Sequence, residues 1–231
     1  MLRKWEQLPE FMKCEEVKNY YIILDHRKRS LLLKRAFDIM AAIILVILLG
    51  IPMLLIAVLI KIDSKGPVFF RQERVTSYGK TFRIHKFRTM VNNADQMGLT
   101  VTVDGDFRIT KVGEKLRGYR LDELPQLFDV LSGDMSFVGT RPETTKYVEK
   151  YTKEMYATLL LPAGITSEAS IRYKNEAKLL SAVENVDMVY MTEVMPNKMK
   201  YNLMSIQRFS LISDMATMMR TIFAVLGKEY E

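Results

Sequence analysis

The sequence predicts a mostly helical α+β fold, in which a re-entrant, membrane-embedded helix precedes a compact domain with a small β-hairpin. Three observations support this prediction. An uncharged, largely aliphatic run covers residues 39–60, two strand-like segments flank Ser77-Tyr78-Gly79, and apolar side chains recur at helical spacing from Leu121. We divide the chain into an amino-terminal extension (1–29), a membrane helix (30–62) and a domain outside the membrane (63–231).

The composition limits the classes of partner and site. The formal net charge is +7, which favours an anionic partner such as a nucleic acid, an anionic membrane surface or a nucleotide-type substrate. Cys14 is the single cysteine, so an intrachain disulfide is excluded and a reducing compartment is expected. Neither His26 nor His85 has a cysteine or second histidine at metal-ligand spacing, which argues against a zinc site.

The first 25 residues read as an amphipathic extension. Aromatic and apolar side chains, among them Trp5, Leu8 and Phe11, are scattered between charges. The segment lacks the basic start, apolar run and small-residue cleavage site of a signal peptide. The sequence assigns it no role.

The strongest single feature is a membrane segment. Residues 27–35 carry five basic side chains, and 22 residues without a charge run from Ile39 to Ile60. As a helix, this run is about 33 Å long, close to the hydrocarbon thickness of a bilayer. A buried core helix is the alternative. Asp38 lies just before the run and is expected to pair with Lys34 or Arg35 near the interface.

Two features favour a helix that enters and leaves the membrane on the same side. Pro52, two residues after Gly50, removes one helical hydrogen bond and kinks the helix. Basic residues also follow the run, beginning with Lys61 and Lys65, so the positive-inside rule favours cytoplasm at both ends. We therefore expect a re-entrant helix and a cytoplasmic domain, with a spanning helix as the alternative.

Residues 68–75 and 80–87 are rich in β-branched and aromatic side chains and predict a β-hairpin. If the second strand continues, Lys86 and Arg88 share a face with Phe82 and Ile84. A basic pair on an otherwise apolar face needs an anionic partner. That partner is either a nearby acid, Asp122 or Glu123, or a substrate phosphate.

The stretch from Leu116 to Glu143 carries the densest chemistry. Apolar spacing from Leu121 predicts an amphipathic helix, and Pro125 is tolerated only near its start, which places Asp122 and Glu123 at the cap or in the first turn. Free N–H groups there favour a carboxylate or a phosphate. Arginines surround the two acids: Arg117, Arg120 and Arg141. The pattern indicates a phosphate-handling site, with ordinary helix capping as the alternative.

The remaining segments carry weaker patterns. Residues 92–112 read as a loop with a turn at Asp104-Gly105-Asp106, and a calcium loop is disfavoured because the other ligands are missing. We expect helices at 143–161, 175–195 (stopped by Pro196) and 203–226, and an extended segment at 165–173 that contains Arg172. The methionine-rich stripe of the last helix suits packing, against either the protein or a bilayer.

Eight segments occur in an order that is specific when they are taken together. They are Lys34-Arg35 with Asp38; Gly66-Pro67-Val68-Phe69-Phe70 with Gln72 and Arg74; Lys86-Phe87-Arg88-Thr89-Met90; Arg108-Ile109-Thr110 with Gly113 and Leu116-Arg117; Leu121-Asp122-Glu123-Leu124-Pro125-Gln126-Leu127; Gly133-Asp134-Met135-Ser136 with Val138-Gly139; Arg141-Pro142; and Pro162 with Gly164-Ile165-Thr166. Between residue 30 and about residue 225 the chain thus resembles the bacterial sugar transferases, the monotopic phosphoglycosyl transferases that start membrane-linked glycan assembly.

The resemblance implies a two-step reaction at the cytoplasmic face of the bacterial inner membrane. A sugar 1-phosphate moves from a nucleotide diphosphate sugar, usually UDP-linked, to a polyprenyl (undecaprenyl) phosphate, and the nucleoside monophosphate is released. Asp122 would be the nucleophile that carries the phosphosugar, and Glu123 would position the metal or the acceptor. Mg²⁺ is the implied cofactor, held by both acids.

The resemblance also assigns the basic residues to the substrate, with Arg172 near the nucleotide: Lys86, Arg88, Arg117, Arg141 and Arg172. These roles agree with the chemistry, because a carboxylate approaches a diphosphate only where cations neutralise its charge. Membrane lipid is a further expected partner, and a homodimer is left open.

The chain departs from the family pattern at four places. Ile51-Pro52 replaces a Ser-Pro pair at the helix break, and Gly139-Thr140-Arg141-Pro142 replaces Gly-Pro-Arg-Pro. Thr166 is followed by Ser167-Glu168 rather than by glycine and an aromatic residue, and Asn202 takes the place of an aspartate. Because the Asp-Glu motif is intact, we expect activity.

Two other functions compete with this one. A membrane-bound hydrolase of UDP-sugars would use the same acid pair and metal, with water replacing the lipid acceptor. A non-catalytic scaffold would bind anionic lipid or nucleic acid through its basic surface. No nucleic-acid partner is expected, because aromatic residues are not interleaved with the basic clusters.

Overall fold

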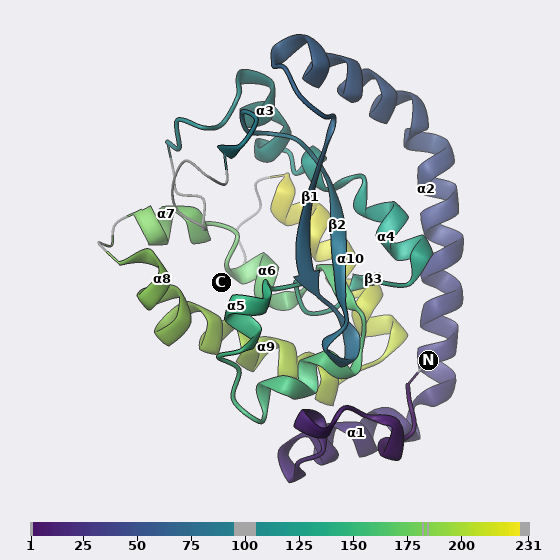
Figure 1. The fold of residues 1–231 in the computed structure, drawn as a ribbon. Coiled ribbons are helices and arrows are strands. Elements are labelled where there is room, and N and C mark those ends of the chain that lie inside the picture. Colours follow the sequence, from purple (N-terminus) through teal and green to yellow (C-terminus); the bar gives the residue numbers. More distant parts are fainter. Residues whose placement is uncertain (1, 95–104, 182, 184, 227–231) are drawn as a thin grey trace.

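A computed structural model describes residues 2–94, 105–181, 183 and 185–226 (Figure 1). The fold is mostly helical, as predicted, with two small two-stranded sheets. The helices are α1 (Glu15–His26), α2 (Lys28–Asp63), α3 (Lys111–Gly118), α4 (Gln126–Ser132), α5 (Thr145–Val148), α6 (Glu168–Arg172), α7 (Glu176–Ser181), α8 (Val186–Val189), α9 (Met195–Gln207) and α10 (Leu211–Val225). The strands are β1 (Phe69–Val75), β2 (Thr81–Phe87), β3 (Met135–Val138) and β4 (Ala163–Thr166).

The long helix α2 contains the whole predicted membrane run. Among the described helices it alone is long and apolar enough to cross a membrane. Only 11% of its most apolar window is buried in the protein. Figure 1 shows α2 bending over the edge of the molecule in its second half, and Pro52 supplies the physical reason, because it has no N–H to donate.

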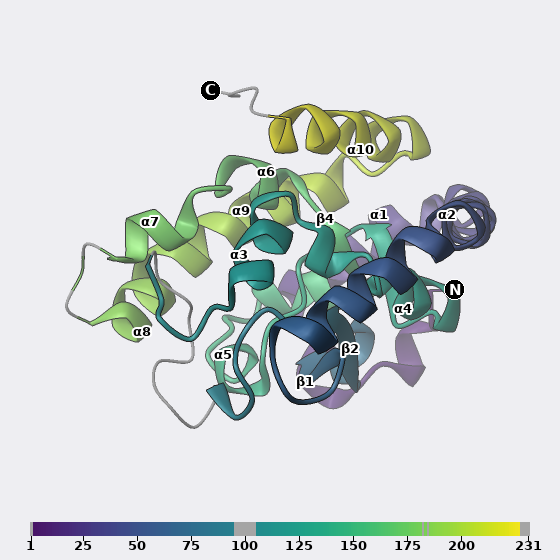
Figure 2. The same cartoon turned by 90° about the horizontal axis from the view of Figure 1, so that it is seen from above.

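The predicted hairpin is confirmed. β1 and β2 pair antiparallel from Phe69 opposite Phe87 to Val75 opposite Thr81. Phe82 and Ile84 face inward and join the core between the hairpin, α2 and α4. The hairpin and α10 lie on opposite sides of the molecule (Figures 1 and 2).

The second sheet was not predicted. β3 and β4 run parallel, joined by the long connection through α5. The two strands come unusually close at Gly139 and Gly164, where an added Cβ on Gly164 would lie 2.2 Å from the Gly139 backbone. Gly164 donates to the carbonyl of Thr140, and Gly139 donates to that of Thr166, so the chain just before Arg141 is held on both sides.

The amino-terminal extension forms part of the main hydrophobic core. Leu8, Met12 and Val17 are buried there with residues of α9. The ring of Phe11 packs edge-on against Tyr156 and lies over Gly79 at the hairpin tip. The segment therefore braces the tip of the hairpin that carries Lys86.

Several predicted elements in the second half of the chain are wrong in extent. The helix expected at 143–161 is reduced to α5 and a 3₁₀ turn at Met155–Leu160. The extended segment expected at 165–173 ends at Thr166, because Ser167 accepts a hydrogen bond from the backbone N–H of Ser170 and caps α6. Of the predicted loop 92–112, residues 95–104, including Asp104, lie outside the described residues, and α3 already begins at Lys111.

Two helix ends were also misplaced. Pro196 does not stop a helix but sits in the first turn of α9, directly after other helical residues. The predicted helix 203–226 is interrupted near Phe209, where Ser210 and Ser213 exchange hydrogen bonds in a capping box and start α10. A turn of π-helix at Tyr190–Val194 joins α8 to α9.

Candidate active site

The two acids of the Asp-Glu motif lie in a 3₁₀ turn, Leu121–Glu123, between α3 and α4. Arg120, just before it, has a left-handed backbone with φ of 56°. Such a conformation costs a residue with a Cβ about 1 kcal/mol and is concentrated at functional sites. Pro125 is the N-cap of α4, near the helix start as predicted, but the placement of the two acids at the cap or in the first turn was wrong: both lie before the helix, and neither caps it through its side chain. The structure thus disfavours ordinary capping as their role.

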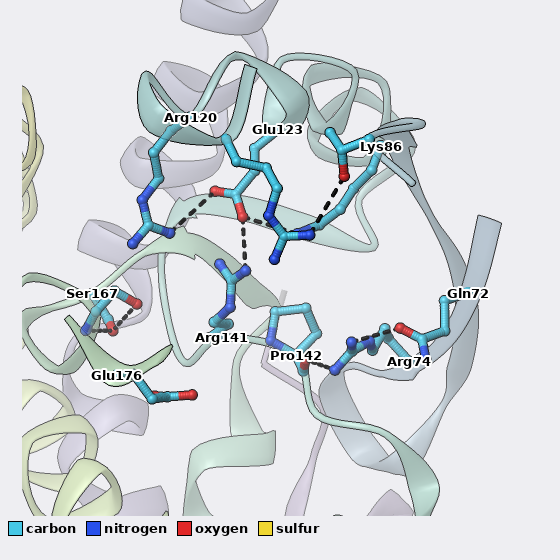
Figure 3. A network of polar contacts seen from close by, with 12 residues as sticks. Gln72, Arg74, Lys86, Arg120, Glu123, Arg141, Pro142, Ser167 and Glu176 are labelled. Carbon is cyan, nitrogen blue, oxygen red and sulfur yellow. Dashed lines mark hydrogen bonds and ion pairs between the residues drawn. The ribbon is translucent and has the colours of Figure 1, made fainter. Parts of the chain in front are cut away.

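Glu123 is buried and gathers three basic side chains (Figure 3). Its Oε1 accepts hydrogen bonds from Lys86 Nζ at 2.9 Å and from Arg141 Nη2 at 2.7 Å. Its Oε2 lies 3.9 Å from Arg120 Nη1. The anionic partner predicted for Lys86 is therefore Glu123, and the hairpin, the 3₁₀ turn Leu121–Glu123 and the 139–143 segment meet at one carboxylate.

The segment that carries Arg141 is fixed from both directions. Arg74 of β1 donates to the carbonyl of Pro142 at 3.2 Å and to Gln72 at 2.6 Å (Figure 3). The next residue, Glu143, is buried and accepts a 2.5 Å hydrogen bond from Tyr190. These contacts fix the chain directly after Arg141 and so restrict the position of Arg141 relative to Glu123.

Asp122 differs from its neighbour. In the described part of the chain its carboxylate makes no hydrogen bond and no ion pair within 4.0 Å. Burial raises the pKa of Asp122, and Lys86 and Arg117 only partly oppose this effect. Burial also opposes ionisation of Glu123, but Arg141, Lys86 and Arg120 outweigh it and hold the pKa of Glu123 well below its usual range. The site thus contains one neutralised carboxylate and one unengaged carboxylate.

The charges around the acids leave a positive excess. Four basic residues face the two acids, so the group carries a surplus of two positive charges: Lys86, Arg117, Arg120 and Arg141 against Asp122 and Glu123. Partly buried surplus charge needs an anion to complete it. A diphosphate has the matching sign, and arginines bind its oxygens in fork geometry.

The donor atoms also fit Mg²⁺ in part. Magnesium commonly takes one or two protein carboxylates and completes its shell with water and substrate phosphates. Asp122 offers both oxygens, and the Oε2 of Glu123 has only the longer contact with Arg120. The described residues contain no group of three acidic, histidine or cysteine side chains that would hold a metal by themselves. These residues therefore fit a metal that arrives with the phosphates of its substrate.

Of the other predicted substrate-binding residues, Arg117 belongs to the basic group around the two acids, whereas Arg88 and Arg172 lie elsewhere in the fold. Arg88 is buried against the end of α2, where it bonds to Lys65, Ser64 and Ile60. Arg117 faces Thr89 at 3.5 Å. Arg172 pairs with Glu168 and lies over the ring of Tyr201. The structure brings Lys86 and Arg141 to Glu123 but gives Arg88 and Arg172 no contact with it.

Three contributors to the site were not among the predicted catalytic or substrate-binding residues, although Arg120 had been noted beside the two acids. Arg120 contacts Glu123, Arg74 holds Pro142, and Tyr190 holds Glu143. Arg120 stands two residues before Asp122, so its sequence position was a usable signal. No sequence signal links Tyr190 to Glu143, because the two residues are 47 positions apart.

The chain is similar to known proteins over most of its length. The model of the bacterial sugar transferase family matches residues 29–228. The chain is 39% identical over 198 residues to a UDP-N-acetylgalactosamine-undecaprenyl-phosphate N-acetylgalactosaminephosphotransferase of Aeromonas hydrophila, covering 84% of this chain and 44% of that protein.

Two further relatives are UDP-glucose:undecaprenyl-phosphate glucose-1-phosphate transferases. The one from Caulobacter vibrioides is 37% identical over 196 residues, covering 84% of this chain and 69% of the relative. The one from Klebsiella pneumoniae is 34% identical over 198 residues, covering 84% of this chain and 40% of the relative. The chain thus spans less than half the length of some of these relatives. With its intact Asp-Glu motif and a family match over nearly its whole length, the chain belongs to the bacterial sugar transferase family.

Proposed function

We propose that this protein transfers a sugar 1-phosphate from a UDP-sugar to a polyprenyl phosphate such as undecaprenyl phosphate, through a covalent intermediate on Asp122, and so initiates a membrane-linked glycan. The observation that carries the proposal is the unengaged carboxylate of Asp122 beside a cluster of basic residues with a positive surplus. A carboxylate in that setting is a nucleophile matched to an anionic phosphorus centre.

The proposed chemistry has two displacements at the same phosphorus. First, an Asp122 oxygen bonds to the phosphorus that carries the sugar, and the bond from that phosphorus to the bridging oxygen breaks, so UMP leaves with the electron pair. Then a phosphate oxygen of the polyprenyl phosphate bonds to the phosphorus and the Asp122 oxygen leaves. The products are UMP, a polyprenyl diphosphate sugar and a regenerated carboxylate.

The residues divide this work between them. Lys86 and Arg141 bind phosphate oxygens and stabilise the charge that develops as UMP leaves, while Glu123 holds both cations in place. Asp122 and Glu123 would hold Mg²⁺, which, when bound, neutralises the diphosphate and so lets the carboxylate approach it. The names of the relatives support UDP-sugars and undecaprenyl phosphate as the substrate classes.

The attachment of α2 supports a re-entrant position in the cytoplasmic membrane. Near its start, Arg35 donates to the carbonyls of Val130 and Leu131 at the end of α4. At its end, the backbone of Ser64 accepts from Arg88, just after β2. Both ends of the helix are thus tied to the body that carries the site, whereas a crossing helix would place its ends on opposite sides of about 30 Å of hydrocarbon.

The apolar surface supports the same position. Much of α2 presents large aliphatic side chains to the outside, for example Ile47 and Ile51, each 74% exposed. On α10, Ile212, Met219 and Phe223 are exposed as well and form an apolar face that suits the interface. Leu121 and Leu124, which flank the two acids, pack against α2, so this embedding would hold the site at headgroup level, where the phosphate of a polyprenyl phosphate lies.

The test is the intact mass of the purified full chain after incubation with Mg²⁺ and a panel of UDP-sugars, without lipid acceptor. We expect a mass increase of one sugar phosphate with the correct donor, absent in Asp122→Asn. UMP release that needs the lipid, with no adduct for any donor, would replace the covalent route with direct transfer. UMP and free sugar phosphate without any lipid would instead indicate a hydrolase.

A further inference from the structure

Glu176 stands at the start of α7 and is held by an unusual partner. Its Oε2 accepts a 2.7 Å hydrogen bond from Lys198 Nζ, and Lys198 is a buried lysine of α9. Its Oε1 makes no hydrogen bond to any described residue and is not among the fully buried oxygens that lack a partner. With its side chain 26% exposed, Glu176 offers one anchored oxygen and one oxygen that solvent or a ligand can reach.

Lys198 is itself held in place by Tyr190. Its ammonium group lies 3.4 Å from the hydroxyl of Tyr190 and over the ring of that tyrosine. The same hydroxyl donates to Glu143, two residues after Arg141. A buried polar chain thus links the segment that carries Arg141 to Glu176, and rigid anchoring of this kind keeps a recognition group in one geometry.

Glu176 lies close to the basic residues that surround Glu123. In Figure 3 it lies on the opposite side of Arg141 from Glu123, with Ser167 nearby in the same view. The charge of Glu176 also acts on the Arg141 guanidinium. The groups on the Glu123 side are cations suited to phosphate oxygens, whereas Glu176 contributes an acceptor that repels phosphate. Glu176 is therefore suited to an uncharged, donor-rich part of the ligand.

Resting on the proposed function, we propose that Glu176 is a specificity-determining residue that accepts hydrogen bonds from a vicinal diol of the nucleotide sugar. An ionised carboxylate is acceptor-only and strengthens hydrogen bonds from hydroxyl donors. Acidic residues recognise ribose hydroxyls in this way at other nucleotide sites. Two diols of the donor have this chemistry, one on the transferred sugar and one on the ribose, and the test separates them.

The test compares wild type with Glu176→Gln, which keeps size and shape but loses the charge. Glu154→Gln is the matched control, because Glu154 also accepts one side-chain hydrogen bond, from Tyr20, away from the site. Calorimetry on the full chain in detergent gives the Kd of UMP, of its 2′-deoxy analogue, and of UDP-sugars that differ at one hydroxyl. Thermal melting checks that all three proteins are folded.

We expect Glu176→Gln to weaken binding of the preferred UDP-sugar by about 10- to 100-fold, the cost of losing a hydrogen bond to a charged group. If the sugar supplies the diol, UMP binding stays unchanged and the preference between sugar epimers narrows. If the ribose supplies it, UMP binding weakens while that of the deoxy analogue does not.

Glu176→Gln affinities equal to those of Glu154→Gln for every ligand would overturn the inference and leave the Glu176–Lys198 pair a structural ion pair. Binding is measured separately from turnover, so the two proposals fail in different ways. If nucleotide sugars bind but no donor loads Asp122 and no UMP is released, the proposed function fails while the role of Glu176 is still decided by the affinities.

Discussion

The guanidinium of Arg88 holds Ser64 through two hydrogen bonds from one nitrogen, 2.6 Å to the carbonyl oxygen and 2.9 Å to the hydroxyl. Ser64 directly follows α2, and Arg88 directly follows β2, two residues after Lys86. The same side chain donates to Ile60 and Lys65. The end of α2 and the strand that contacts Glu123 are therefore joined through one buried cation.

Arg88→Ala should lower the free energy of unfolding by about 2–3 kcal/mol. Carbonyl groups at the end of α2 would lose a charged donor in a buried place, where unpaired acceptors are costly. Denaturant unfolding of the purified chain measures this loss. Arg83→Ala is the control, since Arg83 is an exposed arginine of the same strand. Equal stability of the two variants would show that this junction does not stabilise the fold.

Asp122→Asn should raise the melting temperature at pH 7.5 in the absence of donor and metal. The pKa of Asp122 is raised by burial, so the folded state loses stability as the pH rises from 3.8 to that raised pKa, and the whole penalty is present above it. Below the ordinary value of 3.8 both states are protonated and the penalty is absent. The advantage of the variant should therefore shrink as the pH is lowered below the raised pKa of Asp122 and be lost near 3.8.

Glu123→Gln is the opposite control for that experiment. The pKa of Glu123 is held low, so its ionised form stabilises the folded state above the ordinary value of 4.5. This variant should melt below wild type at pH 7.5. If both variants shifted in the same direction, the assignment of the two carboxylates as one unengaged and one neutralised group would be wrong.

Lys86→Met should reduce kcat/KM by at least about 100-fold, because removing a positioned charge at a reacting phosphate costs several kcal/mol. Lys86 is also the charge that most opposes the raised pKa of Asp122, so the acid limb of the pH–rate profile should move to higher pH. Lys80→Met, at an exposed lysine paired with Asp134, should leave both quantities unchanged. If the acid limb did not move in Lys86→Met, Lys86 would have no influence on the ionisation of Asp122.

Removal of divalent metal with EDTA should stop turnover, and added Mg²⁺ should restore it. The reason is that two carboxylates together with a diphosphate form the oxygen-rich site that Mg²⁺ prefers. Binding of Mg²⁺ alone should be weak, since Glu123 is already engaged by Lys86 and Arg141. Turnover at an undiminished rate in EDTA would remove the metal from the reaction.

Tags placed at the two ends of the chain should both react with reagents on the cytoplasmic side. The structure ties both ends of α2 to the same body through Arg35 and Arg88. Labelling of spheroplasts with a membrane-impermeant reagent, before and after lysis, measures which side each end faces. If one tag is labelled in intact spheroplasts and the other only after lysis, α2 spans the membrane instead.

The sequence predicted those parts of the molecule whose signals are local. The hairpin could be predicted from the β-rich segments around Tyr78. The position of Lys86 on the apolar face of that hairpin predicted an anionic partner, which is Glu123. The apolar run gave α2, and Pro125 gave the start of α4. The pairing of Asp38 with Lys34, four residues apart on one helix, was also confirmed, at 3.8 Å.

Features that depend on distant partners could not be read in this way. Arg88 shares a face with Lys86, yet only the fold shows that the end of α2 takes its guanidinium. Lys198 and Glu176 meet across 22 positions with no periodicity between them. The break before α10 is set by the reciprocal hydrogen bonds of Ser210 and Ser213. It could not be predicted from the apolar pattern, because that pattern continues on both sides of the break.

The double attachment of α2 has a consequence for how the protein responds to its lipid environment. A helix that spans a bilayer must tilt, stretch or thin its surroundings when the hydrocarbon thickness changes. In the proposed embedding, α2 samples one leaflet from one side, and Arg35 and Arg88 clamp its two ends to a rigid body. The height of Asp122 above the headgroups is then a property of the polypeptide, indifferent to the acyl-chain length of the host membrane.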